Sequence, residues 1–326
     1  MIALALLRGV YALLAAIAIA FELVPWTREA FVKYGRTRGV GSGPPPAWTR
    51  LPCAEVVERF ASATVPKNLF SQFYWVGAMA ACLVLLDSLL GLWHVCSSNV
   101  HDSSFGLVHA FLGHIDTWAG HPAPQAVVRA AMDSRRLAAI AGLSMYTGHV
   151  LARLKETVCD QPATQARMHI GQYAVGMIFY IITPVAVVAD AYCKHLWRPV
   201  SLWMIMAGTS LFVYASVHQW RCHHILFRLR RQQLARVSRQ PQPAAAYALP
   251  SSDLFDYVSS PHYLCEILVY VSLWIATGCQ AQTLLWVVLW TAVNLGITAR
   301  ESQLWYRRTF GHKFPQARRA LVPFVW

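Results

Sequence analysis

The densest group of side chains able to do chemistry lies in residues 218–231, which read HQWRCHHILFRLRR. If this stretch is helical, Gln219, His223 and Arg230 share one stripe, because they stand four and seven residues apart. Arginine pairs readily with phosphate oxygens, so the stripe could bind a phosphorylated cofactor. The alternative is an interfacial anchor whose arginines only meet lipid headgroups.

Two further stretches combine polar and aromatic residues. Residues 257–266 read YVSSPHYLCE, in which Pro261 can begin a helix. Glu266 follows His262 by four residues on the same helix face, and a carboxylate inside a membrane is costly unless it is paired. Residues 298–326 contain TARESQLWY, then FGHKFP and an apolar ending. On its own this last stretch is typical of a helix whose basic side chains reach the interface beside an aromatic belt.

The elements that must position these groups are membrane spans. Apolar residues make up 56% of the 326 residues and charged residues 13%, with a mean hydropathy of +0.38, which is too apolar for an ordinary soluble domain. Apolar runs of spanning length predict helices, because lipid offers backbone groups no partner outside their own segment. We therefore expect an all-α integral membrane protein of about seven transmembrane helices, at residues 2–24, 69–95, 137–151, 170–191, 200–217, 263–279 and 283–297.

Charge placement predicts the orientation of these spans. Lysine and arginine concentrate after the first, third and fifth spans and in the tail, while Arg8 is left inside the first span. Because positive charge collects on the cytosolic side, the amino terminus is expected to be lumenal and the carboxyl terminus cytosolic. We expect a single membrane domain over 1–326, with a substrate-side part near 1–200 and a cofactor-binding part near 217–326.

Some connections between the spans are expected to be irregular. Glycine and proline make a helix unfavourable in 39–52, and a proline and alanine stretch fills 240–250. The histidine-rich stretch 101–124 is expected to be a lumenal loop or a partly inserted helix.

Composition and motifs exclude several classes of function. The net charge of +13 does not indicate nucleic acid, because the basic residues sit beside spans rather than on one face. No glycine-rich fingerprint follows a strand, so a Rossmann site is absent, and the eight cysteines form no C-x-x-C pair. His109 and His114, with the histidines of 218–224, imitate the boxes of di-iron desaturases. The predicted topology places the two groups on opposite sides, so no metal site is expected.

Several stretches resemble the steroid 5α-reductase family and, within it, the polyprenal (polyprenol) reductases. The carboxyl-terminal matches are YVSSPHYLCEILVY from Tyr257 and WYRRTFGHKFPQARRALVPFVW from Trp305. The upstream matches that favour the subgroup are YGRT at 34–37, VPKNLFSQFY at 65–74, MHIGQY at 168–173 and HQWRCH at 218–223.

The resemblance implies a seven-helix fold of the endoplasmic reticulum membrane that binds NADPH on the cytosolic side of its later helices. It implies reduction of the α-isoprene double bond on the pathway to dolichal, dolichol and protein N-glycosylation, with a long-chain polyisoprenoid taken from the bilayer as substrate and membrane lipids as neighbours. The cofactor contacts that the resemblance implies are Gln219, His223, Arg230, Tyr247, His262, Glu266, Ser302 and Tyr306.

The chemistry of reduction narrows the substrate. Hydride addition to a double bond leaves negative charge on the neighbouring carbon, and a conjugated carbonyl oxygen is needed to accept it. The substrate is therefore expected to be the aldehyde polyprenal rather than the alcohol. Tyr74 or Lys67 is the candidate catalytic group that polarises the aldehyde oxygen.

Some positions depart from the family pattern. Gln72 and Gln303 stand where the family leads us to expect histidine. The basic pair Arg135 and Arg136 matches, but Ala139 takes the place of the acidic residue expected after it. These departures affect the presumed substrate end more than the cofactor site.

Other functions remain open at this point. A 3-oxo-steroid or an enoyl thioester would suit the same hydride chemistry. The SPHY stretch and the ESxL stretch are also similar to isoprenylcysteine methyltransferases, which use S-adenosylmethionine. A non-catalytic lipid-binding or scaffold protein is a further alternative, and the sequence does not determine the oligomeric state.

Overall fold

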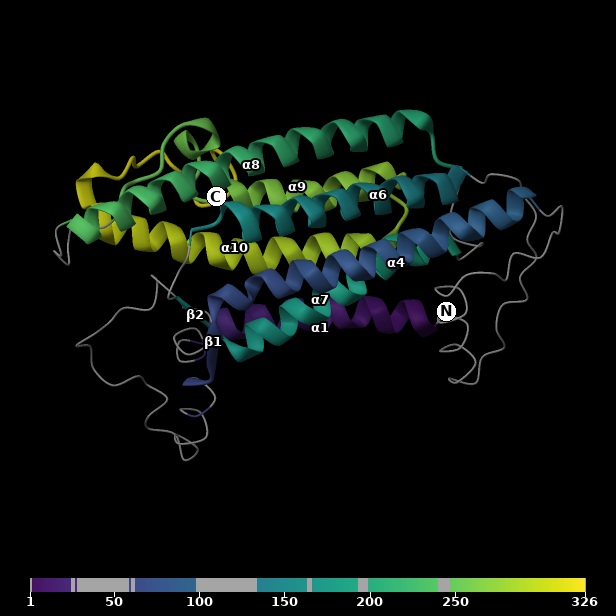
Figure 1. Cartoon of the computed structure of the whole chain (residues 1–326), viewed down its shortest axis with the longest axis horizontal. Coiled ribbons are helices and arrows are strands. Elements are labelled where there is room, and N and C mark those ends of the chain that lie inside the picture. The colour runs from purple at the N-terminus through teal and green to yellow at the C-terminus, as the bar shows by residue number, and fades with distance from the viewer. Residues whose placement is uncertain are drawn as a thin grey trace.

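The computed structural model describes residues 2–24, 27, 59, 62–97, 134–162, 166–192, 199–239 and 247–325. In this part of the chain seven α-helices lie side by side along one long axis (Figure 1). They are α1 (Ile2–Leu23), α4 (Phe70–Ser97), α6 (Ser134–Lys155), α7 (Ile170–Ala189), α8 (Leu202–Arg239), α9 (Pro261–Ala276) and α10 (Gln282–Phe310).

The helices carry the apolar character expected of a membrane protein. Five are long and apolar enough to cross a bilayer, and α9 is a shorter apolar helix of 16 residues. The mostly helical fold class is therefore confirmed, with five candidate membrane-spanning helices in the described residues. α8 is the longest helix, at 38 residues, and continues 22 residues beyond the predicted span 200–217. The five candidate spans are Ile2–Leu23, Lys67–Gly91, Ser134–Asp160, Ile170–Ala189 and Gln282–Lys313.

A tight hairpin joins α9 to α10, whose predicted spans 263–279 and 283–297 leave only three residues between them. Pro261 occupies the first turn of α9, where its missing N–H costs nothing. The helix ends at Ala276, and Gly278 and Cys279 then take positive φ angles of 72° and 57°. These left-handed residues turn the chain within residues 277–281, so that α10 returns alongside α9.

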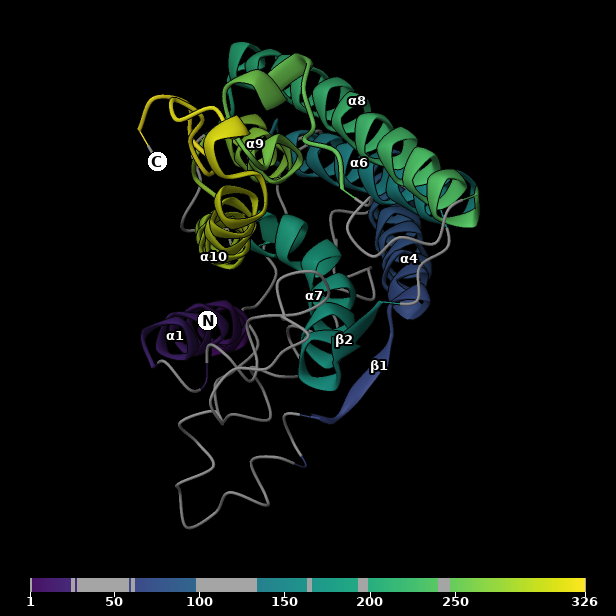
Figure 2. The same ribbon diagram turned by 90° about the vertical axis from the view of Figure 1, so that its left-hand side faces the viewer.

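Small residues allow the helices to approach closely. Figure 2 looks along the bundle, with α8, α9 and α6 grouped above α10, α7 and α4, and with α1 below α10. Gly208 of α8 lies against α9, where an added Cβ would stand 2.6 Å from the Ala276 nitrogen and from the Ser272 oxygen. A glycine at this crossing therefore sets the spacing between the two helices that carry the predicted cofactor residues.

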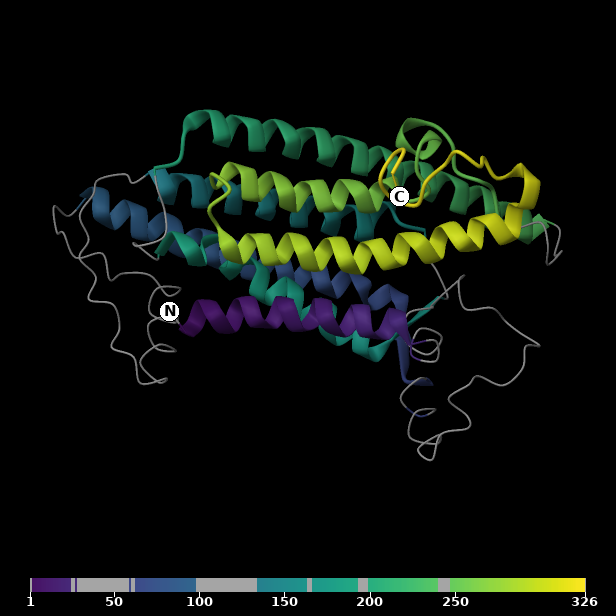
Figure 3. The same ribbon diagram turned by 180° about the vertical axis from the view of Figure 1, so that it is seen from behind.

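An ion pair explains the charge left inside the first span. Arg8 Nη2 lies 2.5 Å from Oδ1 of Asp190, which is 1% exposed. Asp190 Oδ2 also accepts from the backbone N–H of Thr283 at 2.7 Å, at the start of α10. Arg8 Nη1 donates to Gln282 Oε1 at 2.9 Å. These bonds tie α1 to the adjoining ends of α7 and α10, and Figure 3 shows α1 running beneath them.

Two short strands connect the starts of α4 and α7. β1 (Thr64–Pro66) pairs with β2 (Arg167–His169) in an antiparallel register that places Val65 opposite Met168. The backbone N–H of Lys67 then donates to Ala166 O at 2.8 Å. Two stretches quoted for the family resemblance, 65–74 and 168–173, are therefore neighbours in space.

The segment after α10 packs along the segment before α9. The backbone N–H of Ser259 donates to Arg319 O at 2.8 Å, and the N–H of Arg319 donates to Tyr257 O at 3.1 Å. Arg318 Nη1 donates to Pro250 O at 2.9 Å. The two termini lie toward opposite ends of the bundle (Figure 1). The expectations for residues 39–52, 101–124 and 240–246 fall outside the described residues.

Candidate functional site

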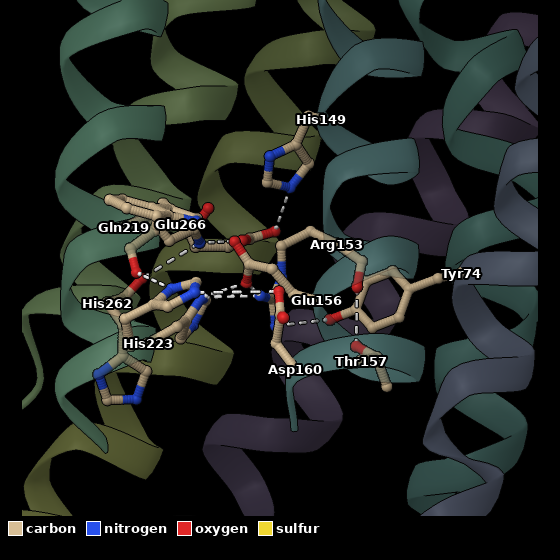
Figure 4. Close-up of polar contacts among 12 residues, drawn as sticks. Tyr74, His149, Arg153, Glu156, Thr157, Asp160, Gln219, His223, His262 and Glu266 are labelled. Atoms are coloured by element: carbon tan, nitrogen blue, oxygen red, sulfur yellow. Dashed lines mark hydrogen bonds and ion pairs between the residues drawn. The ribbon is translucent and has the colours of Figure 1, made fainter. Parts of the chain in front are cut away.

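Four helices bring polar side chains together inside the bundle. We call this group the polar cluster, and Figure 4 shows its members converging from α4, α6, α8, α9 and the π-helical turn η5 (Glu156–Asp160) that continues α6. Its members are Tyr74, His149, Arg153, Glu156, Gln219, His223, His262 and Glu266.

Glu266 has the partners that a carboxylate in this position requires. Its Oε1 lies 3.3 Å from His149 Nε2, and its Oε2 accepts from Gln219 Nε2 at 2.5 Å. The same Gln219 nitrogen lies 3.4 Å from the backbone oxygen of His262. Gln219 is 4% exposed, and α8 and α9 are joined by a partly buried hydrogen bond at this level. The face of α8 that carries Gln219 and the face of α9 that carries Glu266 therefore lie against each other.

Arg153 is the central cation of the polar cluster. It forms an ion pair with Glu156 one turn later on the same helix, and its Nη1 lies 2.7 Å from His223 Nδ1. Its guanidinium carbon lies 5.3 Å from the centre of the Tyr74 ring, and Nη2 stands 3.4 Å from the Tyr74 hydroxyl. The contact with Tyr74 is a cation–π pair with a long hydrogen bond at its edge.

His223 is held between a cation and a carboxylate. Its Nδ1 lies 2.8 Å from Glu156 Oε2 and 2.7 Å from Arg153 Nη1. A ring nitrogen carries either a hydrogen or a lone pair, so Nδ1 donates to Glu156 or accepts from Arg153. The residue stands six positions beyond the predicted span 200–217. Burial, together with the nearby charge of Arg153, lowers the pKa of His223 well below its ordinary range. The ring is therefore neutral at neutral pH.

The two candidate catalytic groups occupy different places. Tyr74 is 4% exposed and packs edge-on against Tyr180, with ring centroids 5.1 Å apart. Its hydroxyl belongs to the polar cluster through Arg153. Lys67 lies in the short 3-10 turn η4 (Lys67–Leu69) beside the two-stranded sheet, seven residues earlier in the chain. The structure thus brings Tyr74 to the polar cluster.

Seven of the eight predicted cofactor residues fall into two groups, and Arg230 lies apart from both. Gln219, His223, His262 and Glu266 belong to the polar cluster, and the His262 ring lies 5.7 Å from the His223 ring. Arg230 lies two turns further along α8 and donates to Gln233 Oε1 at 2.7 Å. The remaining three, Tyr247, Ser302 and Tyr306, lie on or against α10.

The group at α10 is aromatic. Tyr247 is 46% exposed and packs edge-on against Trp305 at 4.9 Å, and Trp305 in turn contacts the Tyr306 ring at 5.2 Å. Ser302 and Tyr306 are buried on α10, one turn apart, so they share one face. An aromatic platform of this kind can stack on the base of a nucleotide.

Three members of the polar cluster, on α6 and its continuation η5, were not predicted from the sequence. Residues 149–156 read HVLARLKE, so His149, Arg153 and Glu156 are four and three residues apart and share one helix face. That spacing is visible in the sequence. However, Arg153 follows the predicted span 137–151 and was therefore expected in a basic loop. Arg135 and Arg136 lie at the opposite end of α6 from Arg153, about 27 Å away at 1.5 Å per residue. Arg153 and Glu156 are the basic and acidic pair of the polar cluster.

The two glutamines that replace expected histidines have local partners. Gln72 Oε1 accepts from the Tyr173 hydroxyl at 2.6 Å, which joins α4 to α7. Gln303 Nε2 donates to Arg318 O at 2.8 Å and holds the last segment of the chain to α10.

The donor and acceptor set of the polar cluster suits a nicotinamide nucleotide. Each Glu266 oxygen makes one bond within the protein and keeps a second lone pair that can accept from a carboxamide N–H. Arg153 and Arg230 supply guanidinium groups of the kind that bind phosphate oxygens. Within the residues that the structure describes, no group of three or more His, Cys, Asp or Glu side chains could hold a metal ion. His109 and His114 lie outside the described residues.

Comparison with known proteins gives consistent matches. Residues 166–326 match the family model described as 3-oxo-5-alpha-steroid 4-dehydrogenase. The chain is 28% identical to polyprenal reductase of Ailuropoda melanoleuca, over 91% of this chain and 86% of that protein. It is 27% identical to polyprenal reductase of Rattus norvegicus over 98% and 96% of the two chains. Polyprenal reductase 2 of Oryza sativa subsp. indica is 26% identical, over 81% and 80%.

Proposed function

We propose that this chain, which belongs to the steroid 5α-reductase family, uses NADPH to reduce the α-isoprene double bond of polyprenal. Family membership supports an oxidoreductase that acts on a carbon–carbon double bond. The observation that supports the cofactor is the bonded group of Gln219, Glu266 and His149, which joins α6, α8 and α9 inside the bundle. The names of the relatives support the polyprenal substrate.

The residues of the polar cluster would hold the nicotinamide end of NADPH. Glu266 accepts from the carboxamide, with Gln219 and His149 keeping its oxygens in place. Arg153 and Arg230 neutralise phosphate charge, and His223, neutral at pH 7, orients Arg153 through its ring nitrogen. Bound NADPH supplies a hydride.

The aromatic group on α10 would hold the other end of NADPH. Tyr247, Ser302 and Tyr306 offer hydroxyls and ring faces for the ribose and adenine. His262, a member of the polar cluster, packs against the His223 ring with the ring centroids 5.7 Å apart.

The substrate is an aldehyde conjugated to the double bond that is reduced. The β-carbon receives hydride, negative charge moves to the carbonyl oxygen, and the α-carbon takes a proton. Tyr74 is preferred over Lys67 as a group near that oxygen, because its hydroxyl lies in the polar cluster beside the Arg153 charge. The product would feed dolichol formation for protein N-glycosylation.

We further propose seven spans in the endoplasmic reticulum membrane, with a lumenal amino terminus and a cytosolic carboxyl terminus. This topology adds α8 and α9 to the five long apolar helices and places Arg230 on the cytosolic side, where NADPH is available. The isoprenoid tail would enter from the bilayer, since exposing it to water costs about 0.8 kcal/mol per methylene.

The proposal is tested with purified protein and NADPH deuterated at the transferable position. Mass spectrometry should find one deuterium at the β-carbon of the saturated aldehyde formed from polyprenal. Polyprenol given alone should remain unchanged, and its turnover would contradict the mechanism. A 4-ene-3-oxo-steroid assayed in parallel reports on the alternative substrate. Thermal stabilisation by S-adenosylmethionine but not by NADPH would favour the methyltransferase alternative.

A further inference from the structure

Tyr270 of α9 has an unmet hydrogen-bonding demand in the centre of the bundle. Its side chain is fully buried, and its hydroxyl has no hydrogen-bond partner within the described part of the chain. Burying a phenol hydroxyl without a partner is costly, and natural proteins rarely retain such a group unless it serves a bound molecule or an ordered water.

The position of Tyr270 relates it directly to the polar cluster. It follows Glu266 by four residues on α9, so both side chains lie on the same face, one turn apart. On α6, Tyr146 precedes His149 by three residues, and its ring centroid lies 6.4 Å from that of Tyr270. The two helices therefore meet at two levels: His149 with Glu266, and one turn further from Arg153, Tyr146 with Tyr270.

The surroundings of Tyr270 are apolar and aromatic. Phe179 packs edge-on against its ring at 5.8 Å, and the His149 ring lies 6.5 Å away. The Tyr146 hydroxyl is likewise buried without a hydrogen-bond partner in the described part of the chain. Both hydroxyls lie in a surrounding of low polarity, where a hydrogen bond is strongest, but only Tyr270 is on the same helix as Glu266.

We propose that the Tyr270 hydroxyl donates a hydrogen bond to the carbonyl oxygen of the substrate. The inference rests on the proposed function, in which Glu266 holds the nicotinamide carboxamide and the reacting end of the substrate lies beside it. Tyr270 is the next donor along the same face of α9. Tyr74, whose hydroxyl lies 3.4 Å from Arg153 Nη2, would be a second donor near that oxygen.

The reaction step uses Tyr270 as a donor and not as an acid. The β-carbon gains a hydride from NADPH, the electron pair of the double bond moves toward oxygen, and an enolate results. Tyr270 keeps its proton and stabilises the enolate oxygen through the hydrogen bond. A proton from solvent then joins the α-carbon, the carbonyl re-forms, and the products are the saturated aldehyde and NADP⁺.

The first experiment compares Tyr270→Phe with Tyr11→Phe. Both tyrosines are fully buried, but the Tyr11 hydroxyl lies 3.0 Å from Thr183 Oγ1 and has its partner in the free protein. Tyr270→Phe should lower kcat by about 10²- to 10³-fold, leave the Kd for NADPH within about twofold, and leave Tm unchanged or higher. Tyr11→Phe should do the reverse, with a lower Tm and kcat within about threefold of wild type.

The second experiment reads the hydrogen bond without turnover. Farnesal, a short isoprenoid aldehyde with a conjugated double bond, is labelled with ¹³C at its carbonyl carbon. The labelled aldehyde is then bound to the protein in the absence of NADPH. Its infrared carbonyl stretch should lie at a lower frequency in wild type than in Tyr270→Phe, because hydrogen bonding weakens the C=O bond. Equal frequencies in the two proteins, or a kcat of Tyr270→Phe within about threefold of wild type, would overturn the assignment. Absence of polyprenal reduction by wild type would instead overturn the proposed function.

Discussion

Buried polar and charged residues in this protein are mostly paired, because an unpaired buried charge is costly. Glu266 stands among apolar neighbours on α9, and its two oxygens are each met by a donor, from His149 and from Gln219. Arg153 and Glu156 neutralise one another. Asp190 and Arg8 do the same near the other end of the bundle. The Tyr270 hydroxyl is among the buried groups of the described residues that have no such partner, and it lies one helical turn from Glu266.

Adjacent histidines on α8 provide a matched pair for testing the cofactor site. His223 is buried against Arg153 and Glu156, whereas His224 is a third exposed and lies 3.9 Å from Asp160. His223→Gln should weaken NADPH binding by about tenfold, because hydrogen bonds to charged groups contribute about 1.5–3 kcal/mol and Gln keeps only part of them. His224→Gln should change the Kd by less than about twofold. Isothermal titration with NADPH measures both, and equal losses would contradict a specific role for His223.

The depressed pKa of His223 predicts how stability depends on pH. Burial and Arg153 keep the ring neutral in the fold, while in the unfolded chain it titrates near its ordinary pKa of about 6.5. Below that pH the unfolded state binds more protons, so the free energy of unfolding should fall as pH is lowered from about 6.5 toward 5. His223→Gln should make this fall shallower in thermal unfolding in detergent. Identical pH slopes for the two proteins would show that His223 is not the group responsible.

At the scale of elements, α6 and its continuation η5 carry the polar face that contacts α4, α8 and α9. His149, Arg153 and Glu156 lie one turn apart on it and meet α9, α4 and α8 in turn. α8 and α9 must approach closely for Gln219 to reach Glu266, and Gly208 permits that approach. The site therefore depends on the spacing of three helices as much as on its polar residues.

Two helix glycines test that spacing. Gly208→Ala would place a Cβ 2.6 Å from backbone atoms of Ala276 and Ser272, so the helices must separate. Overpacking of this kind costs about 1–3 kcal/mol, and the variant should lose several degrees of Tm together with NADPH affinity. Gly148→Ala is the control, since nothing lies within 4 Å of its added Cβ. It should be neutral or slightly stabilising, because alanine favours helix over glycine. A Gly208→Ala protein with wild-type Tm and affinity would contradict the crossing described above.

At the scale of the whole molecule, seven helices in the described residues form one bundle whose termini lie toward opposite ends. The aromatic group on α10 lies beyond the last predicted span, and Arg230 lies beyond the fifth. If all seven helices span the bilayer, both groups emerge on the same side. A nucleotide could then bind from water while a lipid tail stays in the bilayer.

The topology predicts the outcome of glycosylation tagging in microsomes. An acceptor tag placed before residue 2 should be glycosylated, because the amino terminus is expected in the lumen. The same tag placed after residue 325 should remain unmodified, since an odd number of spans puts it in the cytosol. Modification of the carboxyl-terminal tag would reverse the proposed orientation and move the nucleotide site to the lumen.

The sequence by itself determined the helices and part of the site. Apolar runs of spanning length have only one stable backbone form in lipid, so the helical fold class followed from composition and length. Local spacing placed Gln219 with His223 and His262 with Glu266, because four residues return a helix to the same face.

The tertiary structure alone decided which faces meet. His149 and Glu266 are 117 residues apart in sequence, and no local periodicity encodes that contact. The sequence spacing places Arg153 on the same helix face as His149. Only the packing of α6 against α4 and α8 gives Arg153 its partners Tyr74 and His223. The sequence likewise cannot predict that the Tyr270 hydroxyl lacks a hydrogen-bond partner, because the partners of a buried donor depend on every neighbour that the fold supplies.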